Sequence, residues 1–266
     1  MPHAFFDVSH PVIIGHRGAA GSAPENTLVS FAKGLALGAE ILESDIHATR
    51  DGVPVLIHDP YVGRVTEGTA QVEDLTLNQL RELDAGHYFS TDAGKSFPQR
   101  GQGVCIPTLE QAFEAFPDAH FNLEIKANPV NLVGRVIELV EKFDRASRTL
   151  LTAGENPIML ELRRERSTRG SRFAIGASTA DVLSVVRAAI ERKKAPEDVM
   201  ALQIPEEFAD RPLVTRELIE FAHDAEIAVH VWTINEPDAM RRLLALGVDG
   251  LVTDHPERMA ALLDRA

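Results

Sequence analysis

Short apolar runs alternate with longer stretches of helical periodicity along the whole chain. The runs are rich in Val, Ile and Leu, which is typical of strands buried on both faces. We predict eight strands, at 12–16, 41–47, 119–125, 148–152, 172–177, 199–204, 227–233 and 249–253. Eight strands separated mostly by helix-length segments indicate a parallel sheet, and eight is the number that closes a barrel. We therefore predict an α/β fold of the TIM (β/α)8 barrel type.

The segments between the strands carry signals for helix starts. Ser22, Thr76 and Thr108 are each followed three residues later by Glu or Gln, which is the pattern of a capping box. We assign Glu25 to the first of these boxes rather than to catalysis. Proline suits the first turn of a helix, as at Pro237 and Pro256. One face of the segment 131–144 is apolar at helical spacing and comprises Leu132, Val136, Leu139, Val140 and Phe143.

One long irregular stretch follows the second strand. An extended piece at 53–57 leads into residues 59–106, which hold a predicted helix at 76–84 and then a segment rich in Gly, Ser, Asp and charge. Long loops after the C-terminal ends of barrel strands usually lie over the active site. We predict one domain, residues 1–266, with 59–106 as a small insertion within it.

Composition narrows the classes of partner. The 266 residues are 44% hydrophobic and 25% charged, as in a soluble globular protein, and one barrel takes ~250 residues. The formal net charge is −13, from 27 basic and 40 acidic residues, which disfavours nucleic acid and anionic membranes as partners. An anionic substrate would therefore need a bound cation or a few aimed basic side chains.

The chain has a single cysteine, Cys105, which excludes an intrachain disulfide and a zinc site built from cysteines. No apolar run approaches the ~18 residues that span a bilayer. The first residues lack the basic start and long apolar stretch of a signal peptide. We expect a cytoplasmic protein with no stable membrane association and no nucleic-acid partner. A homodimer formed through helix faces is compatible with the sequence, which does not decide the oligomeric state.

Polar residues gather at the C-terminal ends of the predicted strands, where barrels build their active sites. They are His16 at the first strand, Glu43 and Asp45 at the second, His58 at the end of the extended piece, Glu124 and Lys126 at the third strand, and Trp232 at the seventh. Their convergence, more than any one residue, predicts an active site.

Three of these side chains are carboxylates that could share a cation. Glu43 and Asp45 are two apart on a strand, so both point to one face at a spacing of about 7 Å. Glu124, on the adjacent strand, could join them. Three carboxylates in one cavity repel one another unless a cation lies between them, and oxygen ligands suit Mg²⁺ or Ca²⁺. The alternative is that these acids form salt bridges with nearby lysines and arginines.

The remaining polar residues suit cleavage of a phosphodiester. Of His16 and His58, one could deprotonate a nucleophile while the other protonates the leaving alcohol. Arg17 can bind a phosphate through two N–H groups, and Lys126 could direct a positive charge at it. Trp232, the only tryptophan, either packs in the core or forms a wall for the alcohol part of a substrate.

Read together, these residues resemble the glycerophosphodiester phosphodiesterase family. The matching motifs run in the family's order and are His16-Arg17-Gly18, Ala23-Pro24-Glu25-Asn26-Thr27, Glu43-Ser44-Asp45, Thr49-Arg50-Asp51-Gly52, His58-Asp59, Arg64 with Thr66, Glu124-Ile125-Lys126, Val231-Trp232-Thr233-Ile234-Asn235 and the stretch from Gly247 to Asp254. The set covers nearly the whole chain.

The resemblance implies a barrel with an insert after its second strand, and hydrolysis of glycerophosphodiesters such as glycerophosphocholine or glycerophosphoethanolamine to sn-glycerol 3-phosphate and an alcohol. It implies one divalent cation, Mg²⁺ or Ca²⁺, bound by Glu43, Asp45 and Glu124. The implied catalytic residues are His16 and His58, and the implied phosphate contacts are Arg17 and Lys126. We favour His58 as the acid, although the sequence does not fix which histidine is which.

The chain departs from the family at the end of the fourth strand. Many relatives have Ser-Phe there, whereas this chain has Thr152-Ala153-Gly154, and residues 154–198 are its least family-like part. Substrate choice is therefore less determined than reaction type. The alternative function is a lysophospholipase D, for which we find apolar candidates only at Tyr88, Phe89 and Phe97. A sugar-phosphate isomerase or aldolase would need glycine-rich loops after the last two strands, which are absent, and nothing demands a scaffold protein.

Overall fold

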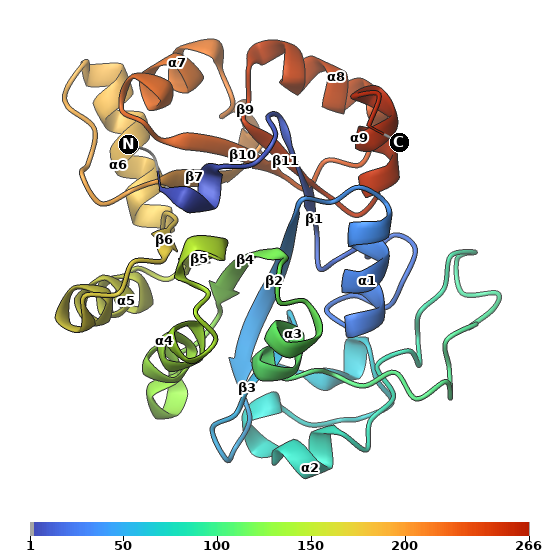
Figure 1. Cartoon of the computed structure of the whole chain (residues 1–266). Helices are drawn as coiled ribbons and strands as arrows, with labels where there is room; N and C mark the ends of the chain where they lie inside the picture. Colours follow the sequence, from blue (N-terminus) through green and yellow to red (C-terminus); the bar gives the residue numbers. More distant parts are fainter. Residues whose placement is uncertain (1–2, 266) are drawn as a thin grey trace.

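Eight parallel strands form the wall of a barrel in the computed structural model, which describes residues 3–265 (Figure 1). They are β1 (Val12–Gly15), β2 (Ile41–Ala48), β4 (His120–Ile125), β5 (Thr149–Thr152), β6 (Ala174–Ile175), β7 (Ala201–Pro205), β10 (Ala228–Trp232) and β11 (Gly250–Thr253). Each lies within one or two residues of a predicted strand, so all eight predictions are confirmed. Residues 1 and 2, which belong to the N-terminal segment considered above for a signal peptide, lie outside the described range.

The order of the strands around the wall is β6-β5-β4-β2-β1-β11-β10-β7. The first and last strands of the chain pair in parallel, from Val12 opposite Gly250 to Gly15 opposite Thr253. At the remaining seam, the backbone N–H of Met200 donates to the carbonyl oxygen of Ile175 at 3.2 Å and brings β7 to β6. The sheet is thus a nearly closed barrel, which confirms the predicted TIM-barrel fold.

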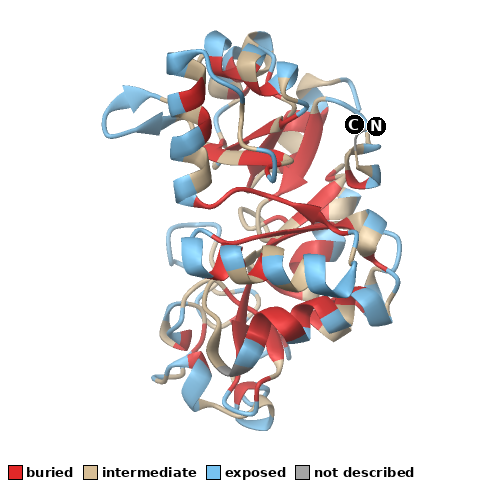
Figure 2. Cartoon of the chain, turned by 90° about the vertical axis from the view of Figure 1, so that its left-hand side faces the viewer, coloured by how far each residue is buried: buried red, intermediate tan, exposed pale blue. Residues whose placement is uncertain are grey.

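Helices cover the outside of this barrel (Figures 1 and 2). They are α1 (Leu28–Ala36), α3 (Leu109–Ala115), α4 (Leu132–Lys142), α5 (Asn156–Arg169), α6 (Thr179–Glu191), α7 (Arg216–Asp224), α8 (Pro237–Leu246) and α9 (Pro256–Leu262), with short 3-10 turns η1 (Ala4–Phe6), η4 (Pro129–Asn131) and η5 (Ala146–Arg148). The apolar stripe predicted on α4 faces the core, where Leu132, Val136 and Val140 are buried. Within residues 3–265, no helix combines the length and apolar character needed to cross a membrane.

The predicted helix starts are confirmed at four of five positions. Thr76 and Thr108 form complete capping boxes, and Pro237 and Pro256 open their helices. The box predicted at Ser22 is wrong, because α1 begins six residues later and its cap is Thr27. The reason is that Glu25, the assumed partner in the box, is bound by two arginines in the barrel mouth.

Two irregular segments extend from the wall. The stretch after β2 contains β3 (Pro54–Leu56), which pairs antiparallel with β2, then η2 (Val62–Arg64), η3 (Val72–Asp74) and α2 (Leu77–Leu80), around a small buried cluster of its own. The helix predicted over 76–84 is therefore shorter, because Asp84 accepts bonds from loop N–H groups at Gly86 and Gly101. A hairpin that we did not predict, β8 (Glu207–Phe208) and β9 (Arg211–Pro212), follows β7.

The end of the barrel opposite the active-site mouth is filled by apolar side chains. Phe5 of η1 is fully buried against Val12, Ile14 and their neighbours. His230 on β10 is 1% exposed, and neither of its ring nitrogens has a hydrogen-bond partner among the described residues. Burial consequently lowers the pKa of His230 to about 4.

Lowering the pH from about 7.5 to about 5 should destabilise the fold through His230. The unfolded chain takes up a proton near the ordinary pKa of 6.5, whereas the folded imidazole stays neutral down to about 4. Stability is lost as the pH falls through that window, and about 2 kcal/mol of the loss at pH 5 comes from this residue. Urea unfolding of the native protein and of His230→Leu at both pH values measures it. Equal pH dependence of the two proteins would contradict the assignment.

Candidate active site

All eight residues predicted for the site line one cavity of about 190 Å³ at the C-terminal mouth of the barrel. They are His16, Arg17, Glu43, Asp45, His58, Glu124, Lys126 and Trp232. His16 and Arg17 follow β1, Lys126 follows β4, and Trp232 ends β10. The parallel strands thus bring together residues from most of the length of the chain, as the barrel geometry requires.

The two acids of β2 lie in the middle of their strand rather than at its end. The strand continues to Ala48, because Ile46, His47 and Ala48 pair with β3 beyond the barrel wall. Within the barrel, Leu42 is level with Gly15 of β1, and Asp45 is level with Glu124 of β4. The carboxylates therefore still reach the mouth, although the predicted position in the strand was wrong.

Each histidine of the site is held by a carboxylate at its Nδ1 atom. His16 donates to Asp254 at 2.6 Å, and Asp254 in turn accepts from the side-chain amide of Asn235 at 2.6 Å. His58 donates to Asp59 at 2.6 Å, and Arg64 pairs with the other oxygen of Asp59. Fixing Nδ1 in this way orients the ring and leaves Nε2 as the atom that can exchange a proton.

The ionisation of His16 reflects this arrangement. Burial by itself acts to lower the pKa of His16, but the hydrogen bond to Asp254 and the negative charge of Glu43 outweigh it, so the pKa is raised. A histidine with a raised pKa is a stronger proton acceptor, which suits the role of a general base.

The backbone at Arg17 and Gly18 turns sharply below the cavity. Arg17 has a φ of 50°, a left-handed conformation that is rare outside glycine. It is held there by bonds from its N–H to Glu43 at 3.0 Å and from the hydroxyl of Ser30 to its carbonyl oxygen at 2.8 Å. Gly18 has a φ of 92°, and a Cβ on it would lie 2.5 Å from Ser30. The turn directs the Arg17 side chain at Glu25, 2.7 Å away.

The buried acids of the cavity differ in how they are neutralised. Lys126 Nζ lies 3.0 Å from Asp45 and 2.8 Å from Glu124, so these two acids have the salt bridges considered as the alternative to metal binding. Burial opposes ionisation of Asp45, yet Lys126 and Arg17 lower its pKa. Within the described part of the chain, Glu43 accepts a single hydrogen bond, from the backbone N–H of Arg17. Burial together with the charge of Asp45 raises the pKa of Glu43 to about 7.

Negative charge is in excess around the mouth. Among the described residues, six carboxylates lie there and three permanent cations contact them. The carboxylates are Glu25, Glu43, Asp45, Asp59, Glu124 and Asp254, and the cations are Arg17, Arg64 and Lys126. If all six were ionised and both histidines neutral, these groups would carry three net negative charges. An anionic substrate, as expected from the sequence, would therefore need further positive charge at the mouth.

The donor chemistry of the cavity fits a hard divalent cation. Glu43, Asp45 and Glu124 supply carboxylate oxygens, which are the ligands that such cations prefer. The pKa of Glu43 is raised because its ionised form is disfavoured, and a nearby cation would favour that form. Among residues 3–265, no three His, Cys, Asp or Glu side chains stand close enough to enclose an ion. Lys126 bridges two of the three acids, so its ammonium would have to leave that position.

Several residues that shape the site escaped the sequence interpretation. Asp254 directly follows the eighth strand, β11. It could have been predicted, because polar residues at the C-terminal ends of barrel strands usually belong to the active site. Asp59 was named only as part of the His58-Asp59 motif, with no role of its own. Glu25 was taken as a helix cap, yet it joins Arg17 to Arg64, with nitrogen–oxygen distances of 2.7 and 2.6 Å.

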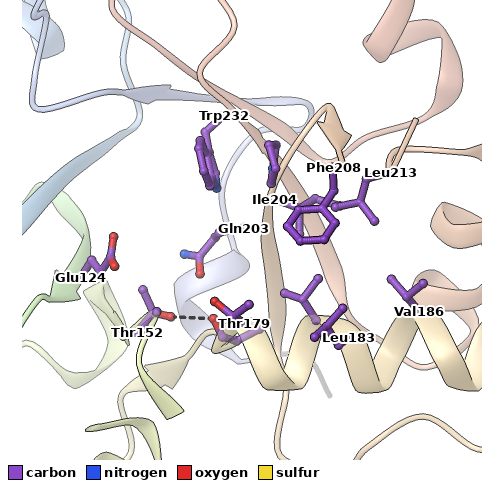
Figure 3. Close-up of a pocket in the computed structure, with 14 residues that line it drawn as sticks. Glu124, Thr152, Thr179, Leu183, Val186, Gln203, Ile204, Phe208, Leu213 and Trp232 are labelled. Carbon is purple, nitrogen blue, oxygen red and sulfur yellow. Dashed lines mark hydrogen bonds between the residues drawn. The ribbon is translucent and has the colours of Figure 1, made fainter. Parts of the chain in front are cut away.

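A second, apolar cavity of about 360 Å³ opens beside the first (Figure 3). Glu124, Thr152, Gln203 and Trp232 line both cavities. The sequence interpretation, which found apolar candidates only at three aromatic residues of the insert, was wrong on this point. One of those aromatic rings, Phe97, is instead covered by the guanidinium of Arg100 at 4.1 Å.

Comparison with known proteins identifies the relatives of this chain. Residues 16–258 match the Glycerophosphoryl diester phosphodiesterase family. A glycerophosphodiester phosphodiesterase from Caldanaerobacter subterraneus is 30% identical over 95% of this chain and 97% of its own length. A lysophospholipase D from Rattus norvegicus is 27% identical over 94% of this chain and 85% of its own. The structure of an Oleispira antarctica phosphodiesterase in complex with the product sn-glycerol-3-phosphate is 25% identical, with a TM-score of 0.75 and coverage of 96% and 97%.

Replacing Lys126 by methionine should destabilise the protein by about 3 kcal/mol, because it leaves the buried carboxylate of Asp45 without its main partner. Lys142→Met, which breaks an exposed pair with Glu110, is the matched control and should cost less than about 1 kcal/mol. Urea unfolding measures both. Adding Mg²⁺ or Ca²⁺ should raise the stability of Lys126→Met more than that of the control. Equal stability of the two variants would show that Asp45 does not depend on Lys126.

Proposed function

The chain belongs to the glycerophosphoryl diester phosphodiesterase family, and from this membership we propose that it hydrolyses glycerophosphodiesters to sn-glycerol 3-phosphate and an alcohol. The single observation that carries the proposal is the pair of histidine–carboxylate contacts, His16–Asp254 and His58–Asp59, on one cavity that also holds Arg17 and Lys126. Two oriented imidazoles and two cations are what general acid–base cleavage of a phosphodiester requires. Glycerophosphocholine and glycerophosphoethanolamine are the first substrates to test.

In the proposed reaction, His16 Nε2 accepts the proton of the attacking hydroxyl, which belongs either to water or to the substrate's own 2-position. The bond between phosphorus and the alcohol oxygen then breaks, and His58 donates its proton to that oxygen. Asp254 and Asp59 keep each ring in the orientation that allows this exchange. If the 2-hydroxyl attacks, a water molecule opens the resulting cyclic phosphate in a second step with the histidine roles reversed.

Arg17 and Lys126 are proposed to hold the phosphoryl oxygens, and Trp232 to form a wall for the organic part of the substrate. Glu43, Asp45 and Glu124 are proposed to bind one divalent cation, Mg²⁺ or Ca²⁺, which when bound would neutralise charge on the phosphoryl group. Lys126, which now pairs with Asp45 and Glu124, would contact the phosphate if that cation took its place beside the two acids. This combination would supply the positive charge that the acidic mouth lacks. The cytoplasmic location and a homodimer stay predictions from the sequence.

Purified protein should release glycerol 3-phosphate from glycerophosphocholine, and the release should stop with EDTA and return with added Mg²⁺ or Ca²⁺. An enzyme-coupled assay for glycerol 3-phosphate measures it. Release of glycerol 3-phosphate that EDTA does not affect would refute the metal dependence but would still support the phosphodiesterase activity. No release from any short diester, with either metal present, would refute the reaction itself.

Single substitutions should separate chemistry from orientation. His16→Ala and His58→Ala should each lower kcat by about 100-fold to 10,000-fold, because each removes a proton-transfer group. Asp254→Asn and Asp59→Asn should lower kcat by about 10-fold to 100-fold, because the rings remain but lose their fixed orientation. Asp249→Asn, at the exposed pair with His223, is a control that should keep kcat within about twofold. Full activity in Asp254→Asn would show that His16 acts without its carboxylate.

A further inference from the structure

We propose that the apolar cavity beside the catalytic one binds the hydrocarbon chain of a lysoglycerophosphodiester, a diester whose glycerol carries a single acyl group. We call this cavity the acyl groove. Its apolar lining comprises Val182, Leu183 and Val186 of α6, Ile204 of β7, and Phe208 and Leu213 of the hairpin region. The proposal rests on the proposed phosphodiesterase activity and names the substrate class of the same site.

The acyl groove is continuous with the catalytic cavity. Glu124, Thr152, Gln203 and Trp232 belong to the walls of both, so a substrate can occupy the two at once. In Figure 3, Leu183 and Val186 on one side face Phe208 and Leu213 on the other, and Trp232 and Gln203 stand between them and Glu124. A group attached to a phosphate in the catalytic cavity therefore enters the acyl groove directly.

The boundary between the two cavities is polar, and the groove beyond it is not. Gln203 donates from Nε2 to Asn122 at 2.7 Å, and its buried Oε1 has no partner among the described residues. Thr152 lies beside it, with its hydroxyl bonded to the carbonyl oxygen of Ala177 at 3.2 Å. In the proposed complex these groups would face the ester and hydroxyl of an acylglycerol, and the aliphatic side chains beyond them would face its hydrocarbon chain.

Exposure of the groove argues for an apolar occupant. Leu183 is 53% exposed, Phe208 is 56% exposed and Trp232 is 44% exposed, so three large apolar side chains meet solvent around one opening. Covering such a patch with hydrocarbon is favourable. Of the described residues that line the groove, Glu124 alone is charged, and it already pairs with Lys126. A cationic head group would thus find little counter-charge inside it, whereas an acyl chain needs none.

The test compares glycerophosphocholine with soluble lysophosphatidylcholines of increasing acyl length, kept below the concentration at which they form micelles. Choline release in the presence of Mg²⁺ or Ca²⁺ measures kcat/KM for each. We expect kcat/KM to rise about fourfold for each methylene that enters the groove, until the groove is full. Leu183→Asp should lower the ratio of kcat/KM on the longest lysolipid to kcat/KM on glycerophosphocholine by at least about tenfold, because it places a charge in the chain's path.

Leu160→Asp is the matched control. Leu160 is a leucine on α5 with an exposure of 55%, close to that of Leu183, and it lies outside the groove lining. It should leave the ratio unchanged, so a fall in both variants would trace to added charge rather than to the groove and would overturn the proposal.

The remaining outcomes distinguish the groove from the reaction. Hydrolysis of glycerophosphocholine with no gain from the acyl chain would overturn the acyl groove and leave the phosphodiesterase intact. A loss on glycerophosphocholine in Leu183→Asp equal to that on the lysolipid would assign the groove to choline and overturn the acyl assignment. A gain with an alkyl chain on the leaving alcohol but none with an acyl chain on the glycerol would do the same. Hydrolysis of none of the diesters would overturn the proposed function and this inference with it.

Discussion

Crowding of negative charge at the barrel mouth is the constraint on which the rest of the site depends. Glu43 and Asp45 project from one strand into a cavity that Glu124 also reaches, and burial makes their mutual repulsion costly. Lys126 lies between Asp45 and Glu124 and pairs with both, and the backbone N–H of Arg17 donates to Glu43. The left-handed conformation of Arg17 is part of this arrangement, because it directs the backbone N–H of Arg17 at the carboxylate of Glu43. The cations of the mouth are already paired with these acids, so a substrate phosphate would have to compete with the acids for Lys126 and Arg17.

The two halves of the barrel mouth carry different tasks. The half formed by β1, β2, β4 and β11 holds the histidines and most of the charged groups. The half formed by β5, β6 and β7, with α6 and the hairpin, is apolar and opens to solvent. The insert contributes to the first half, because Arg64 forms ion pairs with Glu25 and with Asp59, the carboxylate that holds His58. Residues 154–198, which we interpret from the sequence as the least family-like part, include α6 of the second half. The proposed acyl groove therefore takes part of its lining from that segment.

Most of the barrel could be predicted because its strands are continuous apolar runs, and because parallel strands place their C-terminal ends on one face. That rule gathered most of the candidate residues around one cavity, and Arg17 was added because its side chain can bind a phosphate. The rest depends on contacts between distant segments. The cap of α1 is Thr27 rather than the predicted Ser22, because Glu25 forms ion pairs with Arg17 and Arg64. No local sequence pattern reveals these two pairs. The apolar groove was missed because its residues come from a helix, a strand and an unpredicted hairpin, each with an ordinary local sequence. Metal binding, the roles of the histidines and the choice of head group remain predictions.

The contact between His16 and Asp254 has a consequence for how the enzyme comes into being. The two residues are 238 positions apart, and the strands that carry them, β1 and β11, are the first and last of the wall. Until the ribosome has released the last strand, His16 has no carboxylate at Nδ1 and β1 has an open edge. A nascent chain that has not yet reached residue 250 therefore lacks the carboxylate that holds His16, whereas Asp59, the sequence neighbour of His58, is already present. The proposed orientation of His16 thus depends on the closing of the barrel wall, whereas that of His58 does not.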